Sequence, residues 1–279
     1  VIIGIEESEV AFAKFQVEER KMTDYVNYNQ ERWNRVSARQ GNAYTVPLSH
    51  EEFLLAKDKL LSVSLTVGKT VPLDWFEKVQ GKKLLGLACG GGQQGPMFAA
   101  HGYQTTIMDF SKEQLDKDRL VAERENLNLQ TVQADMTQPF PFEDESFDIL
   151  FCPVSNVYIE DLETMWRESY RVLKKGGLLM VGYMNPWIYV FDADSVWEHP
   201  DRALVPMYSL PFNARQLEEI GQITIDPEYG YEFSHTLEEQ IAGQLRAGFA
   251  MIDFYESKDS RNRLTQFASD YIANLSIKW

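Results

Sequence analysis

Three glycines and a downstream aspartate are the residues of this sequence best suited to chemistry. Gly90, Gly92 and Gly95 follow a short apolar run in the spacing G-x-G-x-x-G. Where a strand turns through glycines into a helix, backbone N–H groups approach a ligand closely and the positive end of the helix points at it. Asp109 follows Gly90 at the spacing of about 20 residues that a ribose-binding acid takes. The pattern predicts a nucleotide-like cofactor, and by spacing alone it favours NAD and an oxidoreductase.

The segments that must position these residues alternate between strand-like and helix-like patterns. This alternation predicts an α/β fold with a doubly wound, mostly parallel sheet of seven strands. The last two strands are close enough in sequence to pair antiparallel, and residues 174–177 read as a turn before the fifth strand. The expected strands cover residues 83–88, 104–108, 129–134, 147–151, 178–183, 249–255 and 271–277. The expected helices cover residues 95–101, 111–126, 161–173 and 236–246.

Two segments do not follow this rhythm. Residues 1–78 are expected to form a helical N-terminal cap, in which Ser49 and Glu52 have the spacing of a capping box. The remaining residues, 79–279, are expected to form one domain. Within it, residues 184–232 are rich in Pro, Trp and Tyr and lack a helical period, which predicts an insertion above the sheet that forms part of a substrate site.

The composition narrows the classes of function. The formal charge is −15, from 27 basic and 42 acidic residues without a long Lys/Arg block, so nucleic acid is not an expected partner. No stretch approaches the roughly 18 apolar residues of a membrane span. Two cysteines without framework spacing favour a reducing cytoplasm. Neither these cysteines nor the four histidines have the spacing of metal ligands.

Later motifs separate the cofactor classes. They stand at the ends of the third and fourth expected strands and consist of Asp135, Met136, Cys152 and Pro153. Taken in order with the glycine pattern and the basic turn at residues 171–177, they closely resemble the class I S-adenosylmethionine-dependent methyltransferases. The resemblance covers two ranges, about residues 79–183 and 233–279. It implies a Rossmann-like methyltransferase fold with an antiparallel last strand, S-adenosylmethionine as cofactor and S-adenosylhomocysteine as product.

The resemblance implies a role for each residue that matches the adenosine side of the site. Asp109 would accept hydrogen bonds from the ribose hydroxyls, and Asp135 would accept from the adenine amino group. Phe110 would lie against the adenine, and Met136 would cover the other side of the ring. From the residues alone, Asp109 also suits a helix cap and Asp135 a turn. Phe110 and Met136 likewise suit the core, so these alternatives stay open.

The same resemblance places the methionine half of the cofactor on the glycine turn and at the end of the fourth strand. Cys152 and Pro153 would line the floor beside the sulfonium. Because the first and fourth strands are neighbours in the sheet of this family, Cys89 would lie near Cys152. The residues expected to wrap the methionine part are Ala88, Cys89, Gly90 and Gly92.

One position departs from the family pattern. An acid usually stands three residues before the cysteine of the glycine motif, where it helps to anchor the charged methionine end, and here that residue is Gly86. Gln93 and Gln94 are candidates by position to replace it, and their alternative is an ordinary exposed helix start. Gly86 is also the feature that supports a non-enzyme hypothesis, a methyltransferase-like protein that binds the cofactor without turnover.

The acceptor side carries no obvious catalytic residue, as expected of a reaction that mainly requires alignment of the acceptor behind the methyl group. His235, before the helix that follows the insertion, is the first candidate for catalysis, with a structural histidine as the alternative. Asn156 and Tyr158 follow the fourth strand near the expected methyl position. The sequence thus predicts methyl transfer to an unidentified small molecule and indicates no oligomeric state. Aromatic residues expected to form a lid or to pack the cap are Tyr28, Trp33, Tyr44, Trp187, Tyr189 and Trp197.

Overall fold

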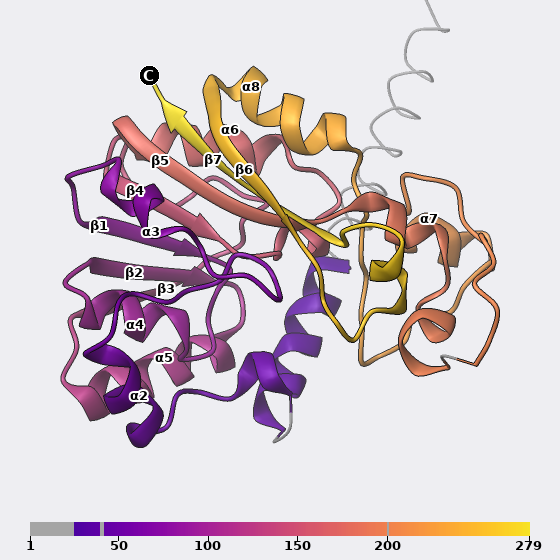
Figure 1. The fold of residues 1–279 in the computed structure, drawn as a ribbon, viewed down its shortest axis with the longest axis horizontal. Coiled ribbons are helices and arrows are strands. Elements are labelled where there is room, and N and C mark those ends of the chain that lie inside the picture. Colours follow the sequence, from indigo (N-terminus) through magenta and orange to yellow (C-terminus); the bar gives the residue numbers. More distant parts are fainter. Residues whose placement is uncertain (1–24, 40–41, 200) are drawn as a thin grey trace, which may run out of the picture.

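The computed structural model describes residues 25–39, 42–199 and 201–279. Within these residues the strands form one seven-stranded sheet in the order β3-β2-β1-β4-β5-β7-β6. Neighbouring strands run parallel, apart from β7, which runs antiparallel to β5 and to β6 (Figure 1). The predicted doubly wound α/β fold, with its antiparallel last strand, is therefore confirmed. The strands are β1 (Lys83–Leu87), β2 (Gln104–Asp109), β3 (Leu129–Gln133), β4 (Phe147–Cys152), β5 (Leu173–Met184), β6 (Phe249–Ser257) and β7 (Tyr271–Lys278).

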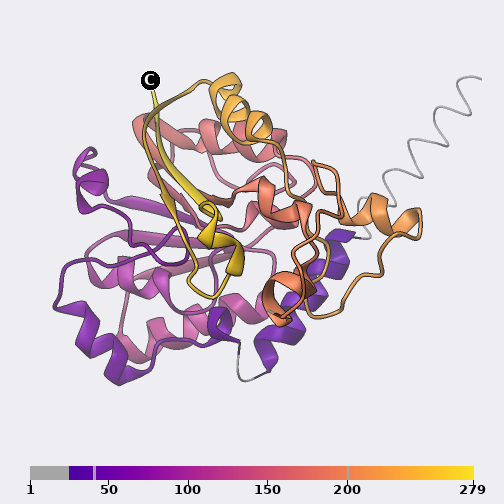
Figure 2. The ribbon, with the colours of Figure 1, turned by 45° about the vertical axis from the view of Figure 1, so that its right-hand side comes forward.

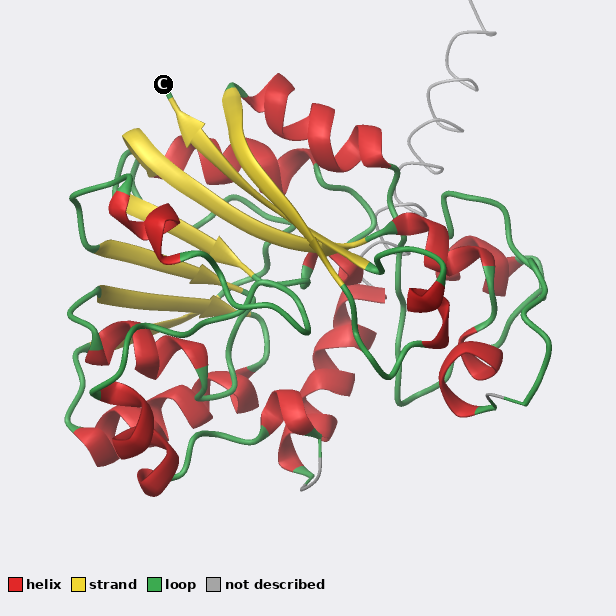
Figure 3. Ribbon diagram, viewed as in Figure 1, coloured by secondary structure: helices red, strands yellow, loops and turns green. Residues whose placement is uncertain are grey.

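Helices cover both faces of the sheet (Figure 3). Successive side chains of a strand point to opposite faces, so on β1 Leu84 packs with Phe98 of one helical layer and Leu85 packs with Trp166 of the other. Burial on both faces explains why the central strands β1 and β4 carry continuous apolar runs, at residues 84–87 and 149–152. The helices are one over residues 25–38, α2 (His50–Lys57), α3 (Leu73–Glu77), α4 (Gln94–Ala100), α5 (Lys112–Glu125), α6 (Glu163–Val172), α7 (Ala214–Glu219) and α8 (Gly243–Ala247).

Several helix boundaries follow the expected local signals. The Ser49 hydroxyl accepts from the Glu52 N–H at 3.2 Å and the Glu52 carboxylate accepts from the Ser49 N–H at 2.8 Å, which is the predicted capping box of α2. Ser111 begins α5 by accepting from the N–H of Gln114. Asn126 ends this helix in the left-handed region, with φ +53°.

The prediction of a turn at residues 174–177, before the fifth strand, is wrong. β5 begins at Leu173, because residues 174–177 bulge from the strand instead of preceding it. The register shows the bulge directly, since Phe147 pairs with Leu173 whereas Ile149 pairs with Leu178. A bulge keeps the strand continuous while it changes the local twist.

The prediction of one continuous helix over residues 236–246 also differs from the structure. The structure has a π-helical turn over Glu238–Ala242 that leads into the short α8. Its predicted start is nevertheless correct, because the Thr236 hydroxyl accepts from the Glu239 N–H at 3.0 Å while the Glu239 carboxylate accepts from the Thr236 N–H at 2.6 Å.

The described part of the expected N-terminal cap shares its core with the sheet. The segment after α2 crosses β5 so closely that a Cβ atom at Gly182 would lie 2.2 Å from the carbonyl oxygen of Leu65. The division of the chain at residue 78 stays a prediction. Residues of the expected cap that share a core cluster with β1, β4 and β5 are Phe53, Val63, Leu65, Val71, Trp75 and Phe76.

The helix over residues 25–38 lies at the carboxyl edge of the parallel strands, between the sheet and the insertion (Figures 1 and 2). Its Asn29 amide donates to the carbonyl of Tyr158 at 3.2 Å and to that of Tyr231 at 3.0 Å. One side chain therefore ties this helix both to the loop after β4 and to the end of the insertion. None of the helices in the described ranges has the length and apolarity needed to cross a membrane.

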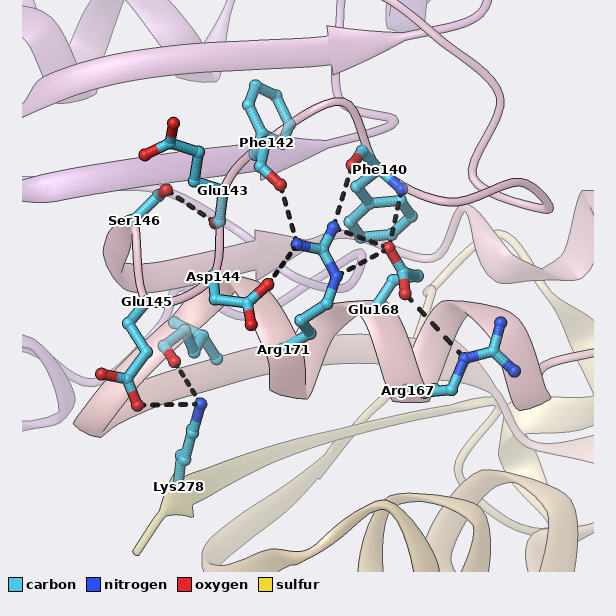
Figure 4. A network of polar contacts seen from close by, with 11 residues as sticks. Phe140, Phe142, Glu143, Asp144, Glu145, Ser146, Arg167, Glu168, Arg171 and Lys278 are labelled. Atoms are coloured by element: carbon cyan, nitrogen blue, oxygen red, sulfur yellow. Dashed lines mark hydrogen bonds and ion pairs between the residues drawn. The ribbon is translucent and has the colours of Figure 1, made fainter.

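A guanidinium fixes the segment that leads into β4 (Figure 4). Nη1 of Arg171 donates to the carbonyl of Phe142 and to Asp144, both at 2.8 Å. Nη2 donates to the carbonyl of Phe140 at 2.9 Å and to Glu168 at 2.8 Å. Because the Glu168 carboxylate also accepts from the Phe140 N–H at 2.9 Å, the segment before β4 is held to α6 from two sides.

Candidate active site

A cavity of about 1200 Å³ opens at the carboxyl ends of β1, β2 and β4. Strand-end residues form one side of it, and the helix over residues 25–38, the segment 62–68 and the insertion form the others. The sheet order reverses between β1 and β4, which is the position where parallel α/β sheets bind ligands. The cavity is therefore the candidate active site.

The glycine turn after β1 forms the wall nearest the sheet. Ala88 adopts φ +48° and Gly91 adopts φ +122°. A Cβ atom at Gly91 would lie 2.9 Å from the carbonyl oxygen of Tyr44, so both the conformation and the contact require glycine there. Of the residues predicted to wrap the methionine part, Ala88, Cys89 and Gly90 line the cavity. Gly92 lies behind the turn, where its carbonyl accepts from the N–H of Leu48 at 3.0 Å.

Asp109 ends β2 and reaches across to the glycine turn. Its Oδ2 accepts from the N–H of Gly90 at 3.1 Å and its Oδ1 accepts from the N–H of Ser111 at 2.9 Å. Burial raises the pKa of this carboxyl to about 6, and the backbone donors oppose that rise. Asp109 also lines the cavity, so the same side chain orders the turn and faces the cavity.

A second buried carboxylate supports the turn from α5. Asp118 is fully buried, and its Oδ2 accepts from the N–H of Gly91 at 3.0 Å. Burial raises the pKa of Asp118 to about 8. We did not predict this residue from the sequence, because its charged neighbours suggest a solvated helix face. The signal was its helical phase, since Leu115 and Val121 three positions away on either side are also fully buried.

The residues predicted to surround the adenine all line the cavity, and each has a structural role too. The Asp135 carboxylate accepts from the N–H of Thr137 at 2.8 Å and from its hydroxyl at 2.7 Å, which closes the turn after β3. Met136 belongs to the apolar core beside α6. The carbonyl of Phe110 accepts from the amide of Gln30 at 2.7 Å. The lining residues in this group are Phe110, Asp135 and Met136.

Cys89 fills the space next to Gly86. A Cβ atom at Gly86 would lie 2.5 Å from Sγ of Cys89 and 2.6 Å from Cδ1 of Ile107, so the acid typical of the family has no room here. Cys152 is fully buried under the turn, and Pro153 lines the cavity. Both thiols are free, and burial raises the pKa of Cys152 to about 12 and that of Cys89 well above its usual value.

The two glutamines after the glycine turn connect it to the N-terminal segment. Oε1 of Gln94 accepts from the N–H of Ser64 at 2.7 Å. Nε2 of Gln93 donates to the carbonyls of Ala43 and Val46, both at 2.7 Å. Both residues line the cavity and make long-range hydrogen bonds, so neither is an ordinary exposed residue at a helix start.

The three candidates for catalysis separate in the structure. His235 is buried with φ +49°, and its Nε2 lies 3.1 Å from the carbonyl oxygen of Asn156. Burial lowers the pKa of His235. The Asn156 amide donates to Gln240 at 2.7 Å, and neither His235 nor Asn156 is among the residues that line the cavity. Tyr158 does line it, with its ring 5.4 Å from that of Trp33.

On the insertion side, a carboxylate that we did not predict from the sequence faces the cavity. Oε2 of Glu232 lies 2.9 Å from the hydroxyl of Tyr189, and both residues line the cavity. Glu232 stands in a segment without periodicity, so the sequence carries no signal for where its side chain points. Of the aromatic residues expected near the acceptor, Trp33, Tyr44, Tyr189 and Trp197 line the cavity.

Comparison with known proteins agrees with this geometry. Residues 85–181 match the model of a methyltransferase domain. A Bacillus subtilis (strain 168) protein, the uncharacterized methyltransferase YbaJ, is 37% identical over 260 residues, which cover 92% of this chain and 100% of that protein. The chain is similar in fold to an S-adenosylmethionine-dependent methyltransferase from Mesorhizobium loti, with a TM-score of 0.58, 19% identity, and 74% of this chain and 95% of that one covered.

A further solved structure covers more of the chain. It is an S-adenosylmethionine-dependent methyltransferase from Clostridium acetobutylicum ATCC 824, with a TM-score of 0.53, 14% identity, and 91% of this chain and 98% of that one covered. At these identities the two structures establish likeness of fold. The family follows from the Bacillus relative, which matches along almost the whole chain. The chain therefore belongs to the class I S-adenosylmethionine-dependent methyltransferases, and S-adenosylmethionine is its cofactor.

Proposed function

We propose that this methyltransferase methylates a small, partly apolar molecule held on the insertion side of the cavity. The observation that carries the proposal is that the same cavity is lined by Gly90 and Asp109 at one end and by Tyr189 and Trp197 of the insertion at the other. When bound, S-adenosylmethionine supplies a methyl group on a positively charged sulfur. A nucleophile of the acceptor attacks the methyl carbon in line with the carbon–sulfur bond, and the sulfur leaves. The protein then contributes mainly by holding the acceptor in position and excluding water.

The residues at the strand ends fit this cofactor. A Cβ atom at Gly90 would lie 3.1 Å from Oδ2 of Asp109, so glycine keeps the carboxylate open toward the cavity. In the described part of the chain, the hydrogen bonds to this carboxylate come from backbone N–H groups, and a carboxylate has about four acceptor sites, which leaves capacity for ribose hydroxyls. We assign the adenine to Phe110, Asp135 and Met136.

We assign the methionine part of the cofactor to residues on the other side of the glycine turn. Because Oε1 of Gln94 is bound to Ser64, the amide Nε2 of Gln94 would donate to the cofactor carboxylate. We assign the remaining contacts with the methionine part to Ala88, Cys89, Gly90 and Pro153. Gly92 and Cys152 would act from behind, by shaping the turn and the floor under it.

Two alternative functions are not favoured. The glycine spacing suggested an NAD-dependent oxidoreductase, and Gly86 suggested a methyltransferase-like protein that binds the cofactor without turnover. A relative that matches along almost the whole chain is a methyltransferase, which speaks against an NAD-dependent oxidoreductase. The charge of −15 counts against a nucleic acid acceptor.

We propose the cytoplasm as the compartment, because both cysteines are free thiols and a reducing environment keeps them so.

Calorimetry with S-adenosylhomocysteine tests the cofactor side of this proposal. Asp109→Ala should weaken binding at least 100-fold, because two hydrogen bonds to a charged acceptor contribute roughly 3–6 kcal/mol together. Asp116→Ala, which removes an exposed carboxylate of α5, is the control and should bind as the wild type does. Full affinity in Asp109→Ala would contradict the ribose assignment. Transfer of a labelled methyl group to a pool of small metabolites then tests the acceptor class.

A further inference from the structure

Glu232 is a half-buried acid on the acceptor side of the cavity. It lies at the end of the insertion and lines the cavity together with aromatic residues of the insertion. Its Oε2 is 2.9 Å from the hydroxyl of Tyr189, whose ring stacks on Phe212 with 5.3 Å between the ring centroids. Burial raises the pKa of the Glu232 carboxyl, and the Tyr189 hydroxyl and the charge of Arg32 oppose that rise.

Arg32 brings a positive charge to the same wall. It is 6% exposed, and its Nε donates to the carbonyl of Glu228 at 2.8 Å. The guanidinium lies 4.2 Å from the ring centroid of Trp33 and 5.7 Å from that of Tyr158. Within the described residues, its buried Nη1 has no hydrogen-bond partner. A cation already occupies these aromatic faces, so the wall does not suit a cationic acceptor.

Three tyrosines that line this part of the cavity stay neutral. Burial raises the pKa values of Tyr158, Tyr189 and Tyr271, so their hydroxyls keep their protons at neutral pH. His235 does not line the cavity. Two other acids that line the cavity are paired with cations, Glu228 with Arg39 and Asp259 with Arg261. Glu232 instead lies beside the Tyr189 hydroxyl, where its carboxylate can accept a proton from a bound acceptor. Aromatic walls with a carboxylate between them suit a flat ring that carries a hydroxyl group.

We propose that Glu232 is the general base for an aromatic acceptor with a phenolic hydroxyl, and that the enzyme is therefore an O-methyltransferase. This inference rests on the proposed function. The hydroxyl transfers its proton to the Glu232 carboxylate while an electron pair of its oxygen forms the bond to the methyl carbon. The carbon–sulfur bond breaks and its electron pair stays on sulfur. The products are an aryl methyl ether, S-adenosylhomocysteine and protonated Glu232, which releases its proton to solvent.

The first test is binding without turnover. The protein is saturated with S-adenosylhomocysteine and titrated in a calorimeter with phenol and with anisole, which has the same ring but cannot donate a hydrogen bond. The wild type should bind phenol about tenfold more tightly than anisole, because only phenol donates to a charged acceptor. Glu232→Leu should lose this preference, and Glu238→Gln, an exposed carboxylate outside the cavity, should keep it.

The second test is turnover with pairs of monocyclic phenols and anilines. We expect the phenols to be methylated and Glu232→Gln to lower kcat 100-fold or more, in the range of general base catalysis, with S-adenosylhomocysteine affinity unchanged within twofold. The wild-type rate should rise with pH and level off as Glu232 ionises, and the variant should lack that inflection.

The outcomes distinguish the two proposals. Failure of the wild type to bind S-adenosylhomocysteine would overturn the proposed function. Binding of S-adenosylhomocysteine without a phenol preference, methylation of anilines in place of phenols, or a Glu232→Gln variant with more than half of the wild-type kcat would each overturn the role of Glu232 alone.

Discussion

The carboxylate of Asp118 accepts a hydrogen bond from the backbone N–H of Gly91, with 3.0 Å between Oδ2 and N. This contact joins α5 to the middle of the glycine turn, where Gly91 holds φ +122°. The position of Gly86 has no space for the acid that in this family usually helps to anchor the methionine end of the cofactor, because the side chain of Cys89 fills it. Asp118 thus places a buried carboxyl group of α5 behind the turn, where it accepts the Gly91 N–H.

Asp118→Ala should weaken binding of S-adenosylhomocysteine about tenfold, because the Gly91 N–H loses its acceptor and the turn loosens. Asp118→Asn should bind within about twofold of the wild type, since its amide oxygen can still accept from that N–H. Calorimetry at pH 7 measures both. Equal affinities for the alanine variant and the wild type would show that the turn keeps its shape without this contact.

The affinity for S-adenosylhomocysteine should depend on pH through Asp109. On the proposed assignment the ribose hydroxyls would donate to the ionised carboxylate, and burial raises the pKa of Asp109 to about 6. Since binding requires the deprotonated form, affinity should be constant above that pH and fall up to tenfold for each pH unit below it. Calorimetry between pH 5 and pH 7 measures the slope. Asp109→Asn should bind weakly at each pH without the slope, and a slope retained in this variant would point to another group.

Bound cofactor should protect the cysteines. Cys89 lines the cavity beside the turn and Cys152 is fully buried below it, and both thiols have raised pKa values because of burial. Alkylation should therefore be slow, and saturating S-adenosylhomocysteine should slow it further at Cys89. Mass spectrometry of iodoacetamide-treated protein gives the rate at each cysteine. Equal rates at Cys89 with and without the ligand would argue against its place beside the cofactor.

Gly86→Ala should destabilise the protein by about 1–3 kcal/mol, the usual cost of overpacking a core. The added Cβ atom would lie 2.5 Å from Sγ of Cys89 and 2.6 Å from Cδ1 of Ile107. Gly86→Asp, which restores the acid of the family pattern, should cost more for the same reason. Urea unfolding measures both. The double variant Gly86→Ala/Cys89→Ala should recover part of the loss, and no recovery would assign the clash to Ile107.

Arg171→Ala should lower the free energy of unfolding by about 3–5 kcal/mol, because the buried Glu168 carboxylate loses its cation and two carbonyls lose their donor. Arg167→Ala is the matched control on the same helix, since that side chain is 58% exposed and lies 3.9 Å from Glu168. It should change stability by less than about 0.5 kcal/mol. Similar losses in the two variants would mean that charge near Glu168, and not the clamp, carries the effect.

The sequence by itself determined the parts of this protein that depend on local patterns. Apolar runs predicted the central strands β1 and β4, because a strand buried on both faces needs continuous apolar residues. The capping box of Ser49 and Glu52 predicted where α2 begins, since both partners are three residues apart. The order of the motifs from Gly90 to Cys152 predicted the family and with it the cofactor.

Only the tertiary structure decided which polar side chains meet. The contact of Asp118 with Gly91 joins residues 27 positions apart, and Arg32 and Glu232 share a wall although they lie in the N-terminal helix and the insertion. His235 has the right place in the chain for an acceptor contact but is buried against Asn156 instead. The physical reason is range: backbone patterns record neighbours within a few residues, whereas side-chain direction at a cavity is set by long-range packing of segments that have no periodicity.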